Sequence, residues 1–403
     1  MKLRAVSRSD TDWSRLDSAT AGLDPVFAAI DLDALSFNAF DMVRRASGKP
    51  IRIATKSVRC RAVVEAALAV PGYKGVLAYT LAEGLWLAET LDDVVVGYPS
   101  VDRASFQTLG KSEELANRVT VMVDSPAQLD LIDAVVPAGK REQIRVAIEL
   151  DSSWDSRVLG HVGVWRSPVH SASQARDLAR VVAGRKGFRL VGLMGYEAQV
   201  AGLGNAPAGK PLLGMAVRRI QRASMSELYE RRSLAVQAVR EVAELEFVNG
   251  GGTGSLEATA ADGSVTEIAA GSGLFGPHLF DSYRHFTPAP AAAFVLPVVR
   301  KPAPDKATLL GGGWIASGPP GVDRLPQLVW PKGLRMVPRE MAGEVQTPVV
   351  GDAARALKVG DRVWARHTKA GELSEHANEL YVVDGDSVSE VVPTYRGEGK
   401  AFL

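Results

Sequence analysis

The feature that most constrains the fold is a regular alternation of short apolar segments with helical segments between residues 51 and 271. Most of the apolar segments are continuously apolar, as is typical of parallel strands buried on both faces. Helix-forming segments lie in nearly every gap between them, which predicts an α/β fold. The eight expected strands cover residues 51–56, 75–79, 93–98, 119–124, 144–151, 190–196, 247–250 and 267–271.

Eight strand-helix units match a (β/α)8 barrel, whose active site lies at the C-terminal ends of the strands. The alternative is an open, doubly wound sheet, which a GxGxxG turn after the first strand would favour. No such turn follows residues 51–56. The widest gap, residues 201–246, combines a Gly/Pro-rich loop with a long charged helical region. A plain surface insertion is favoured there over a lid or an interface element.

The composition changes near residue 284, where prolines crowd together and short strands separated by glycine and proline follow. We expect an all-β C-terminal domain over residues 286–403 and the barrel over residues 33–285. Residues 1–24 are polar and read as irregular. The strand at 26–32 lies outside the count of eight, so the segment 1–32 is expected to associate with the β domain.

Charge and cysteine content exclude several classes of protein. The formal net charge is +1, from 47 basic and 46 acidic residues, which gives no electrostatic case for nucleic acid or a membrane surface. The single cysteine, Cys60, excludes an internal disulfide. No apolar run reaches the length of a membrane span, and the N-terminus lacks a signal-peptide core. A cytoplasmic protein is expected.

One lysine lies where barrel enzymes place their chemistry. The first expected strand ends at Lys56, and the chain then passes directly into a helical segment at 60–69. From position alone, a structural lysine that forms a salt bridge is the favoured interpretation. The alternative is a lysine whose desolvated amine forms a Schiff base with an aldehyde. The choice depends on whether the rest of a cofactor site is present.

Glycine-rich turns follow the last two expected strands. Residues 250–255 read Gly-Gly-Gly-Thr-Gly-Ser, and residues 271–273 read Gly-Ser-Gly. Turns of this kind offer backbone N–H groups to a phosphate, as barrels do after strands seven and eight. Either turn alone is a weak signal, but the two together, opposite Lys56, favour a phosphate-bearing cofactor.

A ring-binding pair is expected at the same end of the barrel. Tyr196 closes the sixth strand, and Arg157 follows the fifth. An aromatic ring and a guanidinium there would hold a flat heteroaromatic ring and its phenolic oxygen. Packing for Tyr196 and a surface ion pair for Arg157 are the alternatives.

The chain resembles the fold-type III pyridoxal 5'-phosphate (PLP) enzymes, which have an alanine-racemase-like N-terminal barrel, and within them the D-threonine aldolase and D-serine dehydratase branch. The motifs at 29–38, 55–57, 195–197, 250–253, 271–272 and 366–369 carry the resemblance. It implies that Lys56 binds the cofactor aldehyde and that Tyr196 and Arg157 contact its ring. The phosphate ligands that it implies are Gly251, Gly252, Thr253, Gly271 and Ser272.

The chain departs from its relatives' pattern at two places. Alanine racemases place an arginine on the pyridine nitrogen, but the matching residue here is Ala269, which favours the aldolase and dehydratase branch. That branch binds a divalent metal, such as manganese or zinc, through a histidine and a cysteine or aspartate two residues later. His367 matches the histidine, but the second position is Lys369. A protonated lysine amine has no lone pair and cannot bind a metal ion.

Three interpretations of the metal position are open. A rearranged site that uses His376, Glu372 or Glu375 is the first, and no metal at all is the second. In the third, the Lys369 ammonium supplies the positive charge of the missing metal. The metal-free interpretations are favoured.

The resemblance implies a PLP-dependent lyase acting on a small 3-hydroxy amino acid of D configuration. Retro-aldol cleavage would give glycine and an aldehyde, whereas dehydration and deamination would give a 2-oxo acid and ammonia. His367, Lys369 and His376 are the candidates for handling the hydroxyl proton, with a solvent-facing role as the alternative for His376. An amino-acid racemase and a non-catalytic PLP-binding protein are the alternative functions. Similar enzymes also imply a homodimer.

Overall fold

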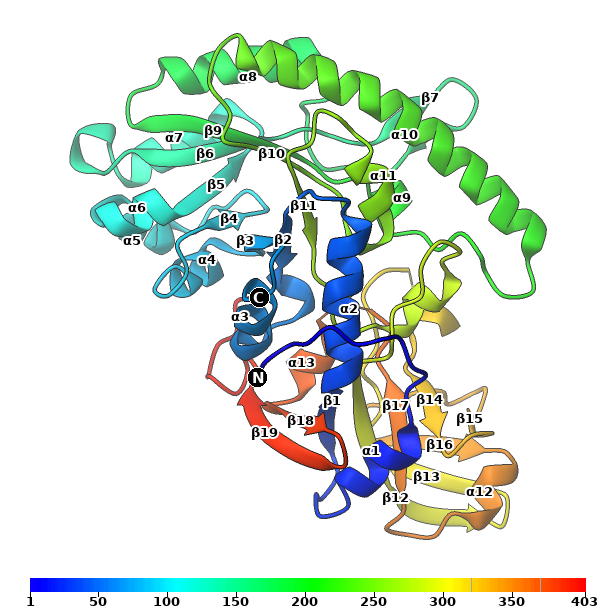
Figure 1. Cartoon of the computed structure of the whole chain (residues 1–403). Coiled ribbons are helices and arrows are strands. Elements are labelled where there is room, and N and C mark those ends of the chain that lie inside the picture. The colour runs from blue at the N-terminus through cyan, green and yellow to red at the C-terminus, as the bar shows by residue number, and fades with distance from the viewer. Residues whose placement is uncertain (320, 370) are drawn as a thin grey trace. The chain divides into compact units, whose positions relative to one another are not determined.

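The computed structural model describes residues 1–319, 321–369 and 371–403 (Figure 1). The chain divides into two compact units. The barrel unit comprises Met42–Thr55, Pro71–Gly271 and Phe402–Leu403. The sheet unit comprises Met1–Asp41, Lys56–Val70 and Ser272–Ala401. Across these described residues, no helix combines the length and the apolarity needed to cross a membrane.

The barrel unit is built on a closed barrel of parallel strands in the order β10-β11-β2-β3-β4-β5-β6-β9 (Figure 1). All eight strands expected from the sequence are present in it, so the predicted (β/α)8 barrel is confirmed. The strands are β2 Ile51–Ala54, β3 Tyr73–Ala78, β4 Val94–Val96, β5 Val119–Val123, β6 Ile144–Glu149, β9 Phe188–Gly195, β10 Phe247–Gly250 and β11 Glu267–Ala270.

Helices alternate with these strands, and polar caps define where several of them begin. The Thr80 side chain accepts a hydrogen bond from the Glu83 N–H, and Ser171 forms a capping box with Gln174. The helices of this unit are α4 Leu81–Leu87, α5 Arg103–Lys111, α6 Glu113–Arg118, α7 Pro126–Val135, α8 Ala172–Gly184, α9 Ala198–Ala201, α10 Pro211–Arg240 and α11 Leu256–Ala260, with the 3-10 turns η2 Ala138–Lys140 and η3 Thr253–Ser255.

The widest gap of the sequence contains α10, which packs against α8 (Figure 1). This helix buries Leu228, Val236 and Val239, so it is the barrel helix between β9 and β10 and not a plain surface insertion. A short antiparallel pair, β7 Trp154–Ser156 and β8 Gly160–Val162, follows β6 and was not expected from the sequence.

A buried ion cluster fills part of the barrel interior. The Arg52 side chain is 1% exposed, and its Nε lies 2.6 Å from Glu267 Oε1. The Asn249 amide donates to Glu267 at 2.9 Å, and Arg52 Nη1 also reaches Oδ1 of Asp93, whose side chain is 38% exposed, at 2.7 Å. Because a buried charge is costly unless it is paired and hydrogen-bonded, these side chains depend on one another.

The sheet unit is built on a nine-stranded sheet with the order β15-β16-β13-β12-β1-β18-β19, in which β17 pairs with β12 and β14. The early strand β1 pairs antiparallel with β12 and parallel with β18. The strands are β1 Phe27–Asp31, β12 Ala292–Ala303, β13 Lys306–Leu310, β14 Gln327–Trp330, β15 Arg335–Met336, β16 Gln346–Val350, β17 Arg362–Arg366, β18 Glu379–Asp384 and β19 Ser387–Pro393.

Strand β12 runs through the proline-rich segment, where the sequence predicts no strand. Register shifts in its pairing with β13 accommodate the interruption around Pro302, because a bulge leaves a residue outside the regular ladder. Short helices also interrupt this unit. They are α1 Trp13–Ala19, α3 Arg61–Leu68, α12 Asp352–Ala356 and α13 Glu372–His376, with η4 His278–Ser282 and η5 Val322–Arg324; α2 Leu32–Arg45 and η1 Thr55–Ser57 each begin in one unit and end in the other.

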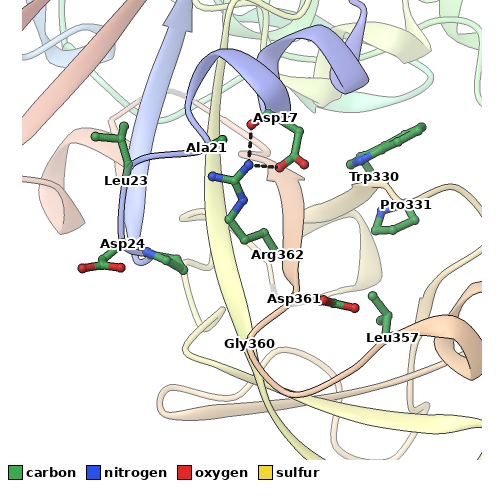
Figure 2. A pocket seen from close by; sticks show the side chains of 11 residues that line it. Asp17, Ala21, Leu23, Asp24, Trp330, Pro331, Leu357, Gly360, Asp361 and Arg362 are labelled. Carbon is green, nitrogen blue, oxygen red and sulfur yellow. Dashed lines mark hydrogen bonds and ion pairs between the residues drawn. The ribbon is translucent and has the colours of Figure 1, made fainter.

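Helix α1 lies in the N-terminal segment that was expected to be irregular, so that expectation was wrong. The Asp12 side chain caps it by accepting from the Arg15 N–H. Asp17 Oδ1 accepts from Trp364 Nε1 at 2.9 Å, and Arg362 pairs with Asp17 at 2.7 Å. Figure 2 shows Asp17 and Arg362 in the lining of a polar cavity. The cavity has a volume of about 480 Å³, and its lining includes none of the predicted site residues.

Candidate active site

The predicted cofactor residues follow strands that are neighbours in the barrel. Strands β9, β10, β11 and β2 are consecutive in its order, and because all are parallel their C-terminal ends share one end of the barrel. Tyr196 follows β9, the turn at 251–253 follows β10, and Gly271 follows β11. Lys56 is the second residue after β2. The C-terminal ends of the strands are where barrel enzymes place catalytic groups.

The glycine turn after β10 packs directly against Tyr196. Gly251 has φ +87°, which glycine adopts without strain. A Cβ on Gly252 would lie 3.1 Å from Tyr196 Cε2 and 2.9 Å from Ala201 Cβ, so the backbone approaches the ring closely. The Gly252 N–H donates to Ser255 Oγ at 3.1 Å, and Thr253 is buried. The turn and the tyrosine form one compact surface.

The second glycine turn has a steric requirement of its own. A Cβ on Gly271 would lie 2.2 Å from the Ala54 carbonyl oxygen, a distance that no side chain tolerates. Glycine therefore allows β11 to end against the end of β2, the strand that precedes Lys56 in the chain. Ser272 follows immediately and belongs to the sheet unit.

An arginine that the sequence reading did not single out lies over the Tyr196 ring. The Arg166 guanidinium carbon is 4.8 Å from the centroid of Tyr196 and 5.1 Å from that of Tyr98, which are cation–π distances. Glu149, the last residue of β6, accepts from Arg166 Nη1 at 3.0 Å. Burial raises the pKa of the Tyr196 hydroxyl to about 12, so the phenol is neutral at pH 7.

The predicted ring ligand Arg157 belongs to the hairpin β7-β8. It is exposed in the turn between β7 and β8, and the role expected of it stays a prediction. Strand β8 lies between Arg157 and Arg166 in the sequence. Arg166 returns to the end of the barrel because Glu149 and the two tyrosine rings hold its guanidinium there.

The backbone segment directly after Lys56 is held by contacts with α13, within the sheet unit. The Ser374 hydroxyl donates to the Val58 carbonyl at 2.8 Å, and Arg59 forms an ion pair with Glu375. Arg59 Nε also donates to the Lys56 carbonyl at 3.0 Å. Arg59 has φ 51°, an uncommon conformation for a residue with a side chain. These contacts hold the backbone immediately after the lysine in one geometry.

His367 is enclosed in the sheet unit. Its side chain is 1% exposed and meets Phe275 edge to face at 6.3 Å between ring centroids. Burial, and then the charge of Arg366, lower its pKa to about 3, so the imidazole is neutral at pH 7. Its Nδ1 has no hydrogen-bond partner among the described residues. The flanking backbone is pinned because the His278 N–H donates to the His367 carbonyl at 3.1 Å.

Lys369 precedes helix α13, and His376 is its last residue. The Lys369 N–H donates to Glu372 Oε1 at 2.5 Å, and burial raises the pKa of Glu372. His376 is exposed, with one face stacked on Trp314 at 4.9 Å between centroids. Desolvation of that face, and then Arg396, lower the pKa of His376 below its usual value. Helix α13 thus connects both candidates to the segment that carries Lys56.

The donor groups do not favour a metal at His367. In the part of the chain that the structure describes, no cluster of three or more His, Cys, Asp and Glu side chains has the arrangement of a metal site. The second position of the expected pair is Lys369, and Glu372 accepts from its backbone N–H. The residues present therefore do not fit the family's metal pair, and we derive no step through a metal.

The fold is a closed parallel barrel. A lysine follows one of its strands, and a glycine turn packs on a tyrosine after two others, which is the arrangement of a (β/α)8 barrel enzyme with its site at the C-terminal strand ends. The model of the alanine racemase N-terminal domain family matches residues 30–278, so the chain belongs to this family. The resemblance stated from the sequence is thereby confirmed. This family and its D-threonine aldolase members use PLP.

Individual relatives agree with this placement. A D-threonine aldolase from Arthrobacter sp. is 28% identical over 291 residues, which cover 70% of this chain and 69% of the relative. The structure is similar to that of D-threonine aldolase from Filomicrobium marinum, with a TM-score of 0.76 at 21% identity over 94% of this chain and 96% of that one. D-threo-3-hydroxyaspartate dehydratase from Delftia sp. HT23 gives a TM-score of 0.70 at 20% identity over 92% and 97%.

Proposed function

We propose that this chain is a PLP-dependent lyase that acts on a small 3-hydroxy amino acid of D configuration. The observation that carries the proposal is the placement of the candidate residues after four consecutive barrel strands, with the glycine turn of Gly252 in close contact with Tyr196. The D-threonine aldolase from Arthrobacter sp. supports the substrate class, because the alignment covers more than two thirds of both chains.

The residues present fit the cofactor. Lys56 would bind its aldehyde, and the turns at 251–253 and 271–272 would receive its phosphate. Arg166 and Tyr196 provide a positive charge and a flat aromatic surface for the ring, and Glu149 fixes the orientation of Arg166. When bound, the cofactor supplies an electron sink for the bond that breaks at Cα.

The chain's own groups then determine the fate of the substrate hydroxyl. Cleavage of the Cα–Cβ bond requires a base at the 3-hydroxyl, whereas elimination requires loss of the Cα proton and departure of the hydroxyl group from Cβ. His376 is suited to accept a proton because its lowered pKa keeps the imidazole neutral at pH 7. Lys369, if protonated, would stabilise negative charge on the oxygen.

Two alternatives from the sequence are less well supported. A racemase of the alanine racemase type would carry an arginine where Ala269 stands, and Ala269 is 5% exposed within β11. A non-catalytic PLP-binding protein would resemble the barrel alone, whereas the similarity to the aldolase of Filomicrobium marinum covers 94% of the chain.

Product analysis tests the proposed function. Purified protein supplemented with PLP is incubated with D-threonine, D-serine and the phenylserine isomers, with the L enantiomers as controls. Glycine plus an aldehyde would identify the aldolase, and ammonia plus a 2-oxo acid would identify the dehydratase. Absence of both product pairs from every substrate would contradict the proposal, and loss of optical activity without loss of amino acid would identify a racemase.

Two further expectations accompany this function. We propose that the protein is a homodimer, as similar enzymes imply. Large apolar side chains are exposed in the segments after the neighbouring strands β6 and β9, among them Trp165 at 85% and Leu212 at 75%. Exposed apolar surface of this kind is typical of interaction sites. A cytoplasmic location is the second expectation, and cell fractionation tests it.

A further inference from the structure

Glu197 is a fully buried carboxylate directly after Tyr196, and no role was assigned to it from the sequence. Its exposure is 0%, and the Gly251 N–H donates to its Oε2 at 3.0 Å. Arg232 Nη2 donates to the same oxygen at 3.1 Å. The hydroxyls of Ser255 and Thr259 donate to its other oxygen. Four donors therefore converge on one carboxylate beneath the glycine turn.

This arrangement requires the charged, acceptor-only form of the side chain. A carboxylate accepts hydrogen bonds at both oxygens. A glutamine side chain would replace one oxygen by an NH2 group, which cannot accept, so the donors that face that oxygen would lose their acceptor. Arg232 balances the charge and is also held by Asp262, at 3.1 Å from Asp262 Oδ2. The network is buried on all sides, because Arg232 is 0% exposed and Asp262 is 3% exposed.

The network fixes the part of the turn that has the most freedom. Gly251 has φ +87°, and a Cβ there would lie 2.6 Å from Ile268 Cγ2 and 3.0 Å from Thr259 Oγ1, so the position requires glycine on both grounds. On the other side, Gly252 lies against Tyr196 and Ala201. The bond from the Gly251 N–H to Glu197 selects one orientation of this peptide, and that orientation determines where the following N–H groups point.

We infer that Glu197 is the positioning residue of the phosphate-binding turn, and that it acts by holding the Gly251 peptide. The inference rests on the proposed function, because it takes the turn at 251–253 as the phosphate site. Glu197 does not itself contact the phosphate, since its two oxygens are occupied by the turn, Arg232, Ser255 and Thr259. Its loss should therefore weaken recognition of the phosphate group more than recognition of the pyridine ring.

The test compares two ligands that differ only in the phosphate, PLP and pyridoxal. Apoprotein of the wild type, Glu197→Gln and Thr259→Val is titrated with each, and dissociation constants are measured by absorbance. We expect Glu197→Gln to weaken PLP binding by about tenfold to a hundredfold, as loss of a buried charged hydrogen bond does, with pyridoxal affinity changed little. Thr259→Val removes one of the four donors and should lower the preference for PLP by a smaller factor.

Glu267→Gln is the matched control, because Glu267 is another buried barrel carboxylate paired with an arginine, Arg52, but belongs to the interior cluster. It should keep the wild-type ratio of pyridoxal to PLP dissociation constants. An unchanged ratio in Glu197→Gln, or in Thr259→Val where Glu197→Gln does not fold, overturns the inference while leaving the proposed function intact. Failure of the wild type to bind PLP at all overturns both.

Discussion

At the scale of single residues, the site depends on side chains whose neighbours restrict them to one role. Tyr196 is buried and neutral, with Arg166 above its ring and Gly252 against its edge. The sequence predicts Tyr196 and, as its partner at the cofactor ring, Arg157, which is the first arginine after the fifth strand. The hairpin β7-β8 is polar and short, so its strands could not be predicted from the sequence. Without the hairpin, the sequence does not show that Arg166 comes back to Tyr196.

Substitution of Arg166 and of Arg157 should have different effects on PLP affinity. Arg166→Lys replaces a planar guanidinium that lies within cation–π distance of two tyrosine rings by a compact ammonium, so we expect PLP affinity to fall by about tenfold. Arg157→Lys is the control and should bind PLP as the wild type does, because Arg157 is exposed. Equilibrium titration of the two apoprotein variants measures both constants. Weaker binding in Arg157→Lys alone would support the role predicted for Arg157 from the sequence and contradict the one proposed for Arg166.

If His376 is the base, it should determine how kcat/KM depends on pH. A base acts in its neutral form, so a lowered pKa extends activity towards acid, and the acid limb of kcat/KM should have its midpoint below the usual histidine value of 6.5. His376→Asn should reduce kcat by about a hundredfold and remove this limb. Rate profiles between pH 4 and 8 provide the measurement. An unchanged limb in His376→Asn would assign the proton transfer to another group.

At the scale of elements, parallel barrel strands are the part of this fold that sequence predicts well. Their residues are buried on both faces, so each strand appears as a continuous apolar run, and all eight were found within a few residues of their bounds. Strand β12 was missed because prolines interrupt its pattern, and α1 was missed because its polar segment buries little, Leu16 alone being fully buried there. Contacts with distant parts of the chain, which the local sequence does not encode, define both: β12 pairs with β1, β13 and β17, and α1 is held by Trp364 and Arg362.

Helix α13 is the element that fixes the backbone after Lys56. Ser374→Ala leaves the buried Val58 carbonyl without its donor, so we expect a loss of about 1–3 kcal/mol in the free energy of unfolding, measured with urea. Turnover should fall as well, because the backbone after Lys56 loses the hydrogen bond that holds the Val58 carbonyl. Ser389→Ala removes a comparable bond, to the Val382 carbonyl, from an exposed serine and should change stability by only a few tenths of a kcal/mol. Equal effects from the two variants would argue against a special role for α13.

At the scale of the whole molecule, the sequence indicated the fold and the family because both depend on patterns that extend over hundreds of residues. The site was only partly predictable. Lys56, Tyr196 and the glycine turns follow strand ends and can be located by counting strands, whereas Glu197 and Arg232 meet only after the chain has folded, 35 residues apart. The enclosure of His367 against Phe275 likewise depends on tertiary packing.

The oligomeric state is the prediction that belongs to this scale. We expect light scattering coupled to size exclusion to give the mass of two chains, against 42.9 kDa for one. Burial of the exposed apolar side chains near Trp165 and Leu212 would provide the driving force. A monomer at micromolar concentration would contradict the dimer without affecting the assignment of the barrel site.

The central claim is that Lys56 anchors PLP at the end of the first barrel strand. The most direct test is to incubate the purified protein with PLP, reduce it with borohydride, digest it and map the pyridoxyl group by mass spectrometry, with Lys56→Ala as the control. The account predicts a single modified peptide that carries the group on Lys56, and no stoichiometric modification in Lys56→Ala. Stoichiometric modification of another lysine, or of none, would contradict it.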